Sequence, residues 1–510
     1  MHAIGIDIGS SNTKVTLVDH DAGVAASASR PLRTRYEGAA VVQDPDELWR
    51  AVADAVREVT AARPDAASDV ACIGVCSQYS SIVPLDATGG AVGPIVMYLD
   101  TRGADRCWDI LARHPDAFET FVERHGIPPI GGGLSLSHLL HLQLDEPALH
   151  ERTAVYLEVM DLVNLRLTGR AAATQSSMFA SQLCDNRSVG VTHYDPELLR
   201  LSGVDADRLP ELLGLDEVVG TVGVELAESL GLPPGVLVRT GINDTQAGAF
   251  ATGALRTGVG SHGEHRAGVM VGTTAVLIDT APVHAVDLER EVLTMPAPVD
   301  GRHLVMAENG VAGRAVEHVL DLLTPASTGA GDPFAELDGA LQRSAPGAGG
   351  LLFLPWLAGS MSPSANTEMR GGFLGMSLTT SRDDLLRSVL EGTAHNLRWL
   401  LPAVEALAGR PADRLVFGGG AARSAAWAQV LADVTDRPVD VLARPELAAA
   451  TAVGLAALRR SAGEDPTTIE LAVRSHHEPD PAAVAAHERN QEQFEAAFEA
   501  TAPICQALRP

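Results

Sequence analysis

The sequence predicts an α/β protein built from two domains of similar construction. At 510 residues the chain is longer than one hydrophobic core usually serves. Strand-like apolar runs alternate with stretches of helical spacing, which is typical of α/β folds. A strand–turn–strand pattern at the N-terminus recurs about half the chain later.

The first of these patterns is a hairpin with a polar tip. Residues 4–19 read IGIDIGSSNTKVTLVD, in which two short β-branched runs flank the turn GSSN. Asp7 lies inside the first run, and a buried charge is costly unless it binds a cation or polar partners. We therefore predict that Asp7 faces a metal. Lys14 is the only lysine of the chain.

The following segments alternate as an α/β fold requires. Residues 44–62 have helical spacing, with Asp44 as a cap and a proline at the first helical position. Residues 70–77 predict a buried strand, and 81–92 predict a strand followed by a turn. Residues 104–125 and 134–154 are expected to be mostly helical.

The second hairpin reads VMVGTTAVLID at 269–279. It repeats the order of apolar strand, glycine, two hydroxyl residues, second strand and closing aspartate. A duplication predicts this repeat, but so short a pattern also arises by chance.

Each half also contains a strand that enters a helix through a polar turn, at 235–255 and 414–434. Ligands of open α/β sheets gather at the carboxyl ends of strands. In the second turn, Gly418 to Ala421 precede a helix that begins near Ser424. This turn can admit a flat ring or a phosphate, or it can be a mere connection. Asp244, in the first turn, fits both a reactive carboxylate and a helix N-cap.

Composition excludes several classes of function. Lys and Arg number 38 against 65 Asp and Glu, so the net charge of −27 disfavours binding to nucleic acid or anionic lipid. Aromatic residues make up only 4%, too few for a base-stacking surface. Phosphate binding would have to use backbone amides or a metal.

The five cysteines are scattered, without a CxxC pair, and no signal or membrane-spanning segment is evident. A reduced, cytoplasmic protein is expected.

The segment GVGSHG at 258–263 matches the glycine pattern of dinucleotide-binding proteins, but it precedes a strand rather than a helix, so it is not expected to bind a dinucleotide. His262, Glu264 and His265 are expected to face solvent. His138 and His141 are expected to be surface or packing residues.

Five segments together resemble the FGGY family of carbohydrate kinases, within the sugar kinase/Hsp70/actin superfamily. Their similarity lies in the first hairpin, the turn with Asp244, VGTTAVL, the long stretch from LLFLPWLAGS to GTAHNLR, and FGGGAARSAAWAQVLADVTDRPV. They occur in the family's order over nearly the whole chain.

The resemblance implies two ribonuclease H-like (actin-like ATPase) domains, at 1–254 and 255–510, with an active-site cleft between them. It implies ATP and Mg²⁺ as cofactors, Asp244 as the catalytic base, and Asp7 and Asp244 at the metal. The implied ATP contacts are Gly9, Ser10, Ser11, Asn12, Thr13, Lys14, Gly272, Thr273, Thr274, Gly418, Gly419, Gly420 and Ala421. Lys14 could equally serve a simple salt bridge. A small sugar and ATP are the expected partners, and a homodimer is an open alternative.

The implied sugar contacts are Gln78, Tyr79, Ser80, Asp100, Arg102, Asn243 and Asp244. Here the chain departs from its relatives. Xylulose kinases usually have Gln-Met-His-Gly at 78–81, and glycerol kinases have Gln-Arg-Glu, whereas this chain has Gln-Tyr-Ser-Ser. Gln175 replaces a common Asp, and Ser360 a common Glu.

We therefore predict an ATP-dependent sugar kinase, with a pentulose such as xylulose as the first candidate. Gluconate, a hexulose and a sugar alcohol remain alternatives. A regulator without transfer activity is disfavoured by the presence of both Asp7 and Asp244.

Overall fold

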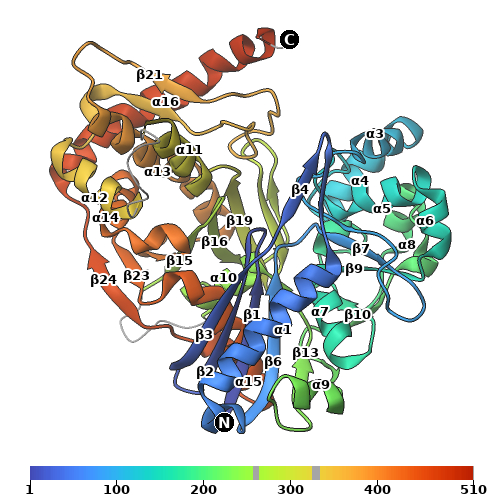
Figure 1. The fold of residues 1–510 in the computed structure, drawn as a ribbon. Coiled ribbons are helices and arrows are strands. Elements are labelled where there is room, and N and C mark those ends of the chain that lie inside the picture. The colour runs from blue at the N-terminus through green and yellow to red at the C-terminus, as the bar shows by residue number, and fades with distance from the viewer. Residues whose placement is uncertain (257–263, 324–332, 509–510) are drawn as a thin grey trace. The chain divides into compact units, whose positions relative to one another are not determined.

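The computed structural model describes residues 1–256, 264–323 and 333–508 and has the predicted mixed α/β class (Figure 1). The chain forms two compact units. The first contains Met1–Ala251, Met295–Leu304 and Ala449–Ile469, and the second contains Thr252–Thr294, Val305–Ala448 and Glu470–Pro510. The predicted domains, 1–254 and 255–510, are each one continuous segment, whereas each of these units contains several segments. The predicted domain limits therefore stay a prediction.

A seven-stranded sheet organises the first unit in the order β12-β13-β6-β1-β2-β3, with β14 beside β6. β1 and β2 form the predicted antiparallel hairpin, and β6 runs parallel to β1. The strands are β1 (His2–Ile8), β2 (Asn12–Asp19), β3 (Val24–Pro31), β6 (Val70–Ser77), β12 (Val218–Thr221), β13 (Leu237–Arg239) and β14 (Ile242–Asn243).

An eight-stranded sheet organises the second unit in the order β17-β18-β19-β16-β15-β22-β23-β24. Its strands are β15 (Arg266–Val271), β16 (Ala275–Ala281), β17 (Val286–Asp287), β18 (Val292–Pro296), β19 (His303–Asn309), β22 (Arg414–Gly418), β23 (Val439–Leu442) and β24 (Val473–His477).

The two sheets share one local topology. In each, an antiparallel hairpin (β1–β2 or β15–β16) pairs through its first strand with a later parallel strand, β6 or β22. A second parallel strand follows, β13 in the first sheet and β23 in the second. The next strand, β12 or β24, is antiparallel to it and forms the edge of the sheet. This agreement confirms the internal repeat that the two hairpins predicted.

Three small sheets complete the strands. A five-stranded sheet of the first unit has the order β4-β5-β8-β7-β9, and the two others pair β10 with β11 and β20 with β21. Their bounds are β4 (Thr34–Glu37), β5 (Ala40–Gln43), β7 (Ile82–Leu85), β8 (Ile95–Val96), β9 (Val155–Glu158), β10 (Ala172–Thr174), β11 (Glu211–Leu213), β20 (Leu352–Leu354) and β21 (Gly372–Leu374).

The helices of the first unit confirm the local predictions. The Asp44 side chain accepts hydrogen bonds from the amides of Asp46 and Glu47 and so caps the first helix. These helices are α1 (Pro45–Ala62), α2 (Pro64–Ala67), α3 (Ala104–Arg113), α4 (Ala117–Arg124), α5 (Ser135–Leu144), α6 (Pro147–Arg152), α7 (Val159–Thr168), α8 (Pro196–Ser202), α9 (Val224–Ser229) and α10 (Asp244–Thr252), which crosses into the second unit by one residue.

The other helices come from the second half of the chain. They are α11 (Gly313–Leu323), α12 (Pro333–Arg343), α13 (Arg382–Ala408), α14 (Ala425–Thr435), α15 (Ala448–Ser461) and α16 (Pro481–Ala507). Of these, α15 belongs to the first unit except for its first residue.

Glycines let α15 lie directly against the first unit's sheet. A Cβ added to Gly5 would come within 1.8 Å of the Ala450 carbonyl oxygen, and one added to Gly74 within 2.3 Å of the Val453 oxygen. Only a residue without a side chain permits so close a helix–sheet contact. The abundance of Ala and Gly in the sequence is explained here by packing.

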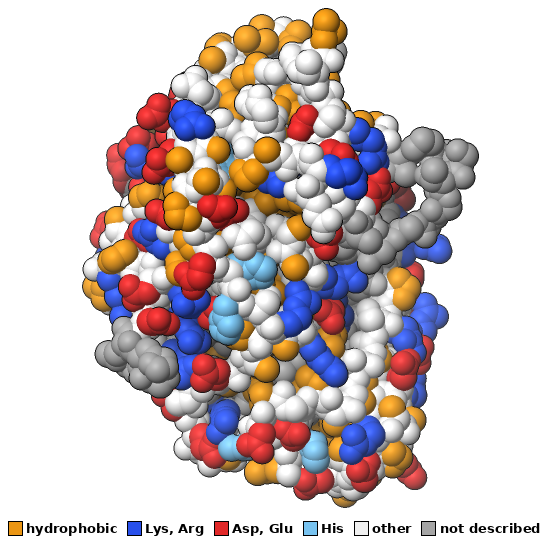
Figure 2. All heavy atoms as spheres, turned by 90° about the vertical axis from the view of Figure 1, so that its left-hand side faces the viewer, with side chains coloured by type: hydrophobic (Ala, Val, Ile, Leu, Met, Phe, Trp, Pro, Cys, Tyr) orange, Lys and Arg blue, Asp and Glu red, His pale blue; other side chains and the backbone are white. Residues whose placement is uncertain are grey.

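No helix of the described residues is both long and apolar enough to cross a bilayer. All five cysteines are free, as expected from their spacing. On the face drawn in Figure 2, basic and acidic side chains are interspersed.

Candidate active site

Strand register places Asp7 in a polar row across the first unit's sheet. Asp7 pairs with Lys14 on β2 and with Cys76 on β6. Its carboxylate lies 3.8 Å from the Lys14 Nζ, and the Cys76 thiol donates to it with a sulfur–oxygen distance of 3.8 Å. Burial raises the pKa of Asp7, whereas Lys14 and the thiol act to lower it. Asp7 is therefore a largely buried carboxylate at the carboxyl end of a central strand.

Asp244 is the first residue of α10, directly after β14. The Asn243 side chain accepts from the Gln246 amide at 2.8 Å, and the Gln246 side chain accepts from the Asn243 amide at 3.0 Å. This reciprocal pair is a capping box, so the N-cap is Asn243. Capping therefore does not account for Asp244, which accepts from the Thr245 amide at 2.9 Å. Asn243 as a sugar contact stays a prediction.

The Cys76 thiol is close enough to both aspartates to be influenced by their charges. Burial raises the pKa of this thiol well above the ordinary value, and the negative charges of Asp7 and Asp244 raise it further. Both carboxylates thus lie near one neutral thiol. Sequence reasoning missed Cys76, because its position opposite Asp7 depends on the pairing of two strands whose facing residues are 69 positions apart.

Hydrogen bonds to the backbone fix the tip of the first hairpin, and some of its side chains are exposed to solvent. The Gly9 amide donates to the Asn12 carbonyl at 3.0 Å, and the Ser10 carbonyl accepts from the Gln43 side chain at 2.8 Å. Ser11 and Asn12 are exposed. Thr13 is buried, and its hydroxyl donates to the Asp7 carbonyl at 3.3 Å. The tip is a rigid turn with outward-facing polar groups.

The second hairpin tip has the same construction in the second unit. The Gly272 amide donates to the Thr274 carbonyl at 2.9 Å, and the Thr273 carbonyl accepts from the Ala312 amide at 3.0 Å, just before α11. Glu308 on β19 makes a hydrogen bond with the Thr274 side chain, and burial raises the pKa of this glutamate to about 6. Glu308 is a second residue that the sequence did not identify.

The glycine turn after β22 contains two glycines with different roles. Gly419 has a left-handed φ of 86°, and a Cβ there would lie 2.3 Å from the Val271 carbonyl oxygen. Gly420 has no atom within 4 Å of an added Cβ. Ser424 caps α14 as predicted, accepting from the Trp427 amide at 3.0 Å. Gly419 is therefore required by the fold, and Gly420 faces open space. Gly418 and Ala421 are buried.

Three of the predicted sugar contacts, Gln78, Tyr79 and Ser80, lie in the loop between β6 and β7. The Gln78 side chain is 4% exposed, and its Oε1 has no hydrogen-bond partner among the described residues. The Tyr79 ring stands edge-on to Phe179, with centroids 6.3 Å apart. Ser80 is 3% exposed and has a left-handed φ of 59°.

Asp100 and Arg102 form an ion pair in the next loop. Asp100 is fully buried and accepts from the Arg102 Nη2 at 2.8 Å and from the Val41 amide at 3.0 Å. Burial by itself would raise the pKa of Asp100, but these hydrogen bonds lower it. The guanidinium of Arg102 is thus neutralised by its own neighbour.

Gln175, which departs from the family pattern, fastens a loop. Its Nε2 donates to the Ser188 carbonyl at 2.9 Å, and its Oε1 accepts from the Gly190 amide at 2.8 Å. Both ends of the carboxamide are therefore used within the protein.

The histidine predictions had mixed outcomes. His138 and His141 are buried, in agreement with a packing role. The prediction for His265 was wrong, because this side chain is 7% exposed and lies 2.8 Å from the Asp279 carboxylate. The strand that follows places it beside β16, which its polar sequence neighbours did not indicate. Glu264 is exposed, as predicted, and His262 lies outside the described residues.

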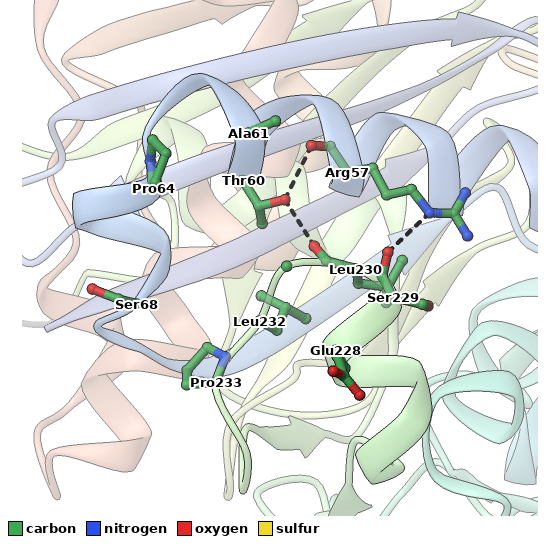
Figure 3. Close-up of a pocket in the computed structure, with 11 residues that line it drawn as sticks. Arg57, Thr60, Ala61, Pro64, Ser68, Glu228, Ser229, Leu230, Leu232 and Pro233 are labelled. Carbon is green, nitrogen blue, oxygen red and sulfur yellow. Dashed lines mark hydrogen bonds between the residues drawn. The ribbon is translucent and has the colours of Figure 1, made fainter.

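A surface pocket of about 610 Å³ lies elsewhere in the first unit, between the end of α1 and the segment 228–233 (Figure 3). The Thr60 hydroxyl donates to the Leu230 carbonyl at 2.7 Å, and the Arg57 Nε to the Ser229 carbonyl at 3.1 Å. These polar groups hold the two walls together. None of the predicted site residues lines this pocket.

In the described part of the chain, no group of three or more His, Cys, Asp or Glu side chains could enclose a metal ion. Mg²⁺, however, keeps several waters and usually takes only one or two carboxylates together with substrate phosphates. Asp7 and Asp244, both near the Cys76 thiol, fit that requirement.

The fold is of the actin-like ATPase type, and comparison with known proteins agrees. Two family models match the chain. The N-terminal domain of the FGGY family of carbohydrate kinases matches residues 2–251, and the C-terminal domain of the same family matches residues 267–460. The chain belongs to the FGGY family of carbohydrate kinases, and it is an ATP-dependent kinase of a carbohydrate hydroxyl.

Relatives cover nearly the whole chain. The xylulose kinase of Escherichia coli (strain K12) is 26% identical over 98% of this chain and 99% of its own. The gluconokinase of Bacillus subtilis (strain 168) is 25% identical over 86% of this chain and 84% of its own. The crystal structure of xylulose kinase from Rhodospirillum rubrum is 25% identical and superimposes with a TM-score of 0.83, over 99% of this chain and all of that one.

Proposed function

We propose that this kinase phosphorylates a neutral ketose, with xylulose as the first candidate. The proposal rests on the ion pair that Arg102 makes with Asp100. Arg102 is the one cation among the predicted sugar contacts. Asp100 occupies its guanidinium through two nitrogens, Nε and Nη2. An aldonate such as gluconate needs an unneutralised cation for its carboxylate, whereas a ketose needs only hydrogen bonds.

The relatives support the same choice. Full-length similarity to a protein named xylulose kinase favours a pentulose. Gluconate remains the second candidate, because a protein named gluconokinase is nearly as similar.

In the proposed mechanism, Asp244 takes the proton from the attacking sugar hydroxyl as its bond to phosphorus forms. Asp7 would help to hold Mg²⁺, and the hairpin tips at 9–13 and 272–274 would offer amides and hydroxyls to the phosphates of ATP. When bound, Mg²⁺ would neutralise the charge on the transferred phosphoryl group. The turn at 418–421 receives the adenosine.

A coupled ADP-release assay over pentuloses, hexuloses, aldonates, polyols and glycerol tests the proposal. Xylulose is expected to give the highest kcat/KM. Glycerol is expected to be a poor acceptor, because the Arg-Glu pair of glycerol kinases is missing at 79–80 and polar groups left without partners reduce affinity steeply. The proposal is wrong if gluconate or glycerol is the best acceptor.

A further inference from the structure

A buried carboxylate lies beneath the loop that carries the predicted sugar contacts. Glu158, the last residue of β9, is fully buried, and one of its oxygens accepts from the Ser81 amide at 2.9 Å. The Ser80 backbone also hydrogen-bonds to this carboxylate. Its other oxygen accepts from the hydroxyl of Ser135, the first residue of α5. Glu158 therefore ties two consecutive peptides of the loop to a helix.

His138, one turn along α5, lies near the Ser80 backbone. Its side chain is fully buried, and neither ring nitrogen makes a hydrogen bond of ordinary geometry within the described residues. The Ser80 backbone and Asp100 nevertheless lie close enough to favour its protonated form. Burial outweighs both and lowers the pKa of His138 to about 4, so the ring is neutral near pH 7.

The Ser80 conformation requires such support. A residue other than glycine at φ 59° is strained and persists only where its surroundings hold it. The neighbouring loop presses on the same turn of α5, since a Cβ on Gly103 would lie 2.1 Å from the Ser137 carbonyl oxygen. The first turns of α5 are thus a common base for both sugar loops.

We propose that Glu158 is a positioning residue of the sugar pocket. Its carboxylate holds the peptides of Ser80 and Ser81 while Ser80 is in its left-handed conformation, and in this way it fixes the directions of Gln78 and Tyr79. The effect on sugar binding rests on the proposed function, because it requires that Gln78 and Tyr79 contact the sugar.

The clamp is expected to depend on pH. Burial raises the pKa of Glu158 to about 7, against the hydrogen bonds of Ser135 and the loop amides. The carboxylate accepts from three donors, and protonation weakens these hydrogen bonds because the acceptor loses its charge and one oxygen then carries an O–H donor. Asp161 on α7 also interacts with Glu158, and burial raises the pKa of Asp161 well above its ordinary value. The charged or titratable neighbours of His138 are Asp100, Arg102 and His141.

We therefore expect the KM for the sugar to rise as the pH falls through about 7, whereas the KM for ATP should stay unchanged over the same pH range. The variant Glu158→Gln is expected to raise the sugar KM about tenfold, the effect of weakened hydrogen bonds to a charged group, and to remove this pH dependence. Glu391→Gln is the matched control. Glu391 is a buried glutamate of the second unit whose pKa is also raised to about 7 by burial, and it contacts no predicted sugar residue. Its variant should keep the parental sugar profile. A parental sugar KM and pH profile in Glu158→Gln would overturn the role of Glu158.

Hydrogen exchange gives a readout that does not require activity. The amides of Ser80 and Ser81 are expected to exchange about tenfold faster in Glu158→Gln. If that variant does not fold, Ser135→Ala removes one of the three donors and should show a smaller increase. Unchanged exchange in a folded variant contradicts the clamp. If the parent phosphorylates no sugar but exchange increases, the proposed function fails while the clamp stands.

Discussion

At the scale of single residues, the division of labour between Asn243 and Asp244 makes the catalytic base testable. Asn243 supplies the cap of α10, so a change at Asp244 leaves the helix start intact. Asp244→Asn keeps the shape of the side chain and removes one charge and the base. We expect kcat to fall by at least about 10²-fold, the usual contribution of a general base, with little change in thermal stability.

Binding measurements complete this test. Calorimetry should show that Asp244→Asn still binds sugar. Turnover within a few-fold of the parent, in a variant that folds and binds both substrates, would remove Asp244 from the mechanism.

Lys14 can be examined without mutation, because the chain has no other lysine. An amine-specific reagent has two targets, the Lys14 ammonium and the N-terminal amine, which pairs with Asp69 at 2.5 Å. If Lys14 contacts phosphate, a non-hydrolysable ATP analogue with Mg²⁺ should slow labelling of Lys14 and leave the N-terminus unaffected. Mass spectrometry of both sites measures this. Equal labelling of Lys14 with and without nucleotide would assign it to the ion pair with Asp7 alone.

At the scale of elements, the turn after β22 distinguishes ligand contact from fold. Gly420→Leu places its side chain in open space, so it should obstruct adenosine and raise the ATP KM about tenfold or more, a loss typical of poor fit at a binding site. The sugar KM and the circular dichroism spectrum should stay close to the parental values. An unchanged ATP KM would leave the turn as a connection only.

Gly419 is the contrasting position. Its left-handed φ and its contact with the Val271 carbonyl predict that Gly419→Leu is destabilised whether or not ATP binds. A thermal shift in Gly419→Leu but not in Gly420→Leu would separate the two roles.

At the scale of the whole molecule, the first unit depends on a helix from far along the chain. A fragment of residues 1–254 lacks α15, whose backbone lies against Gly5 and Gly74. It also lacks residues 295–304, where the Pro296 carbonyl accepts from the Gln246 side chain at 2.8 Å. We expect this fragment to show no cooperative thermal transition, because a core face of its sheet would be exposed. A cooperative transition like that of the parent would contradict this.

The same contact can be tested in the full chain. Gly74→Val should reduce the free energy of unfolding by about 1–3 kcal/mol or more, the usual cost of overpacking. Gly223→Ala is the control, since no atom lies within 4 Å of a Cβ there. Equal stability of both variants would contradict the close helix–sheet contact.

The sequence by itself determined the local structure, that is, features formed by residues close together in the chain. The two hairpins, the Asp44 cap, the helix start at Ser424 and the strand that contains Asp7 follow from neighbouring residues, because capping, turn chemistry and strand patterns act over a few positions. The family resemblance rested on the same segments and was confirmed.

Only the tertiary structure decided which residues meet. The Cys76 thiol near two aspartates, the clamp of Glu158, the buried contact of His265 with Asp279 and the packing of α15 on Gly5 all join positions distant in sequence. The cap at Asn243 depends on the end of β14, which is fixed by its pairing with β6. Such contacts depend on strand register and helix docking, and these are set by the burial of the whole core, which no local pattern specifies.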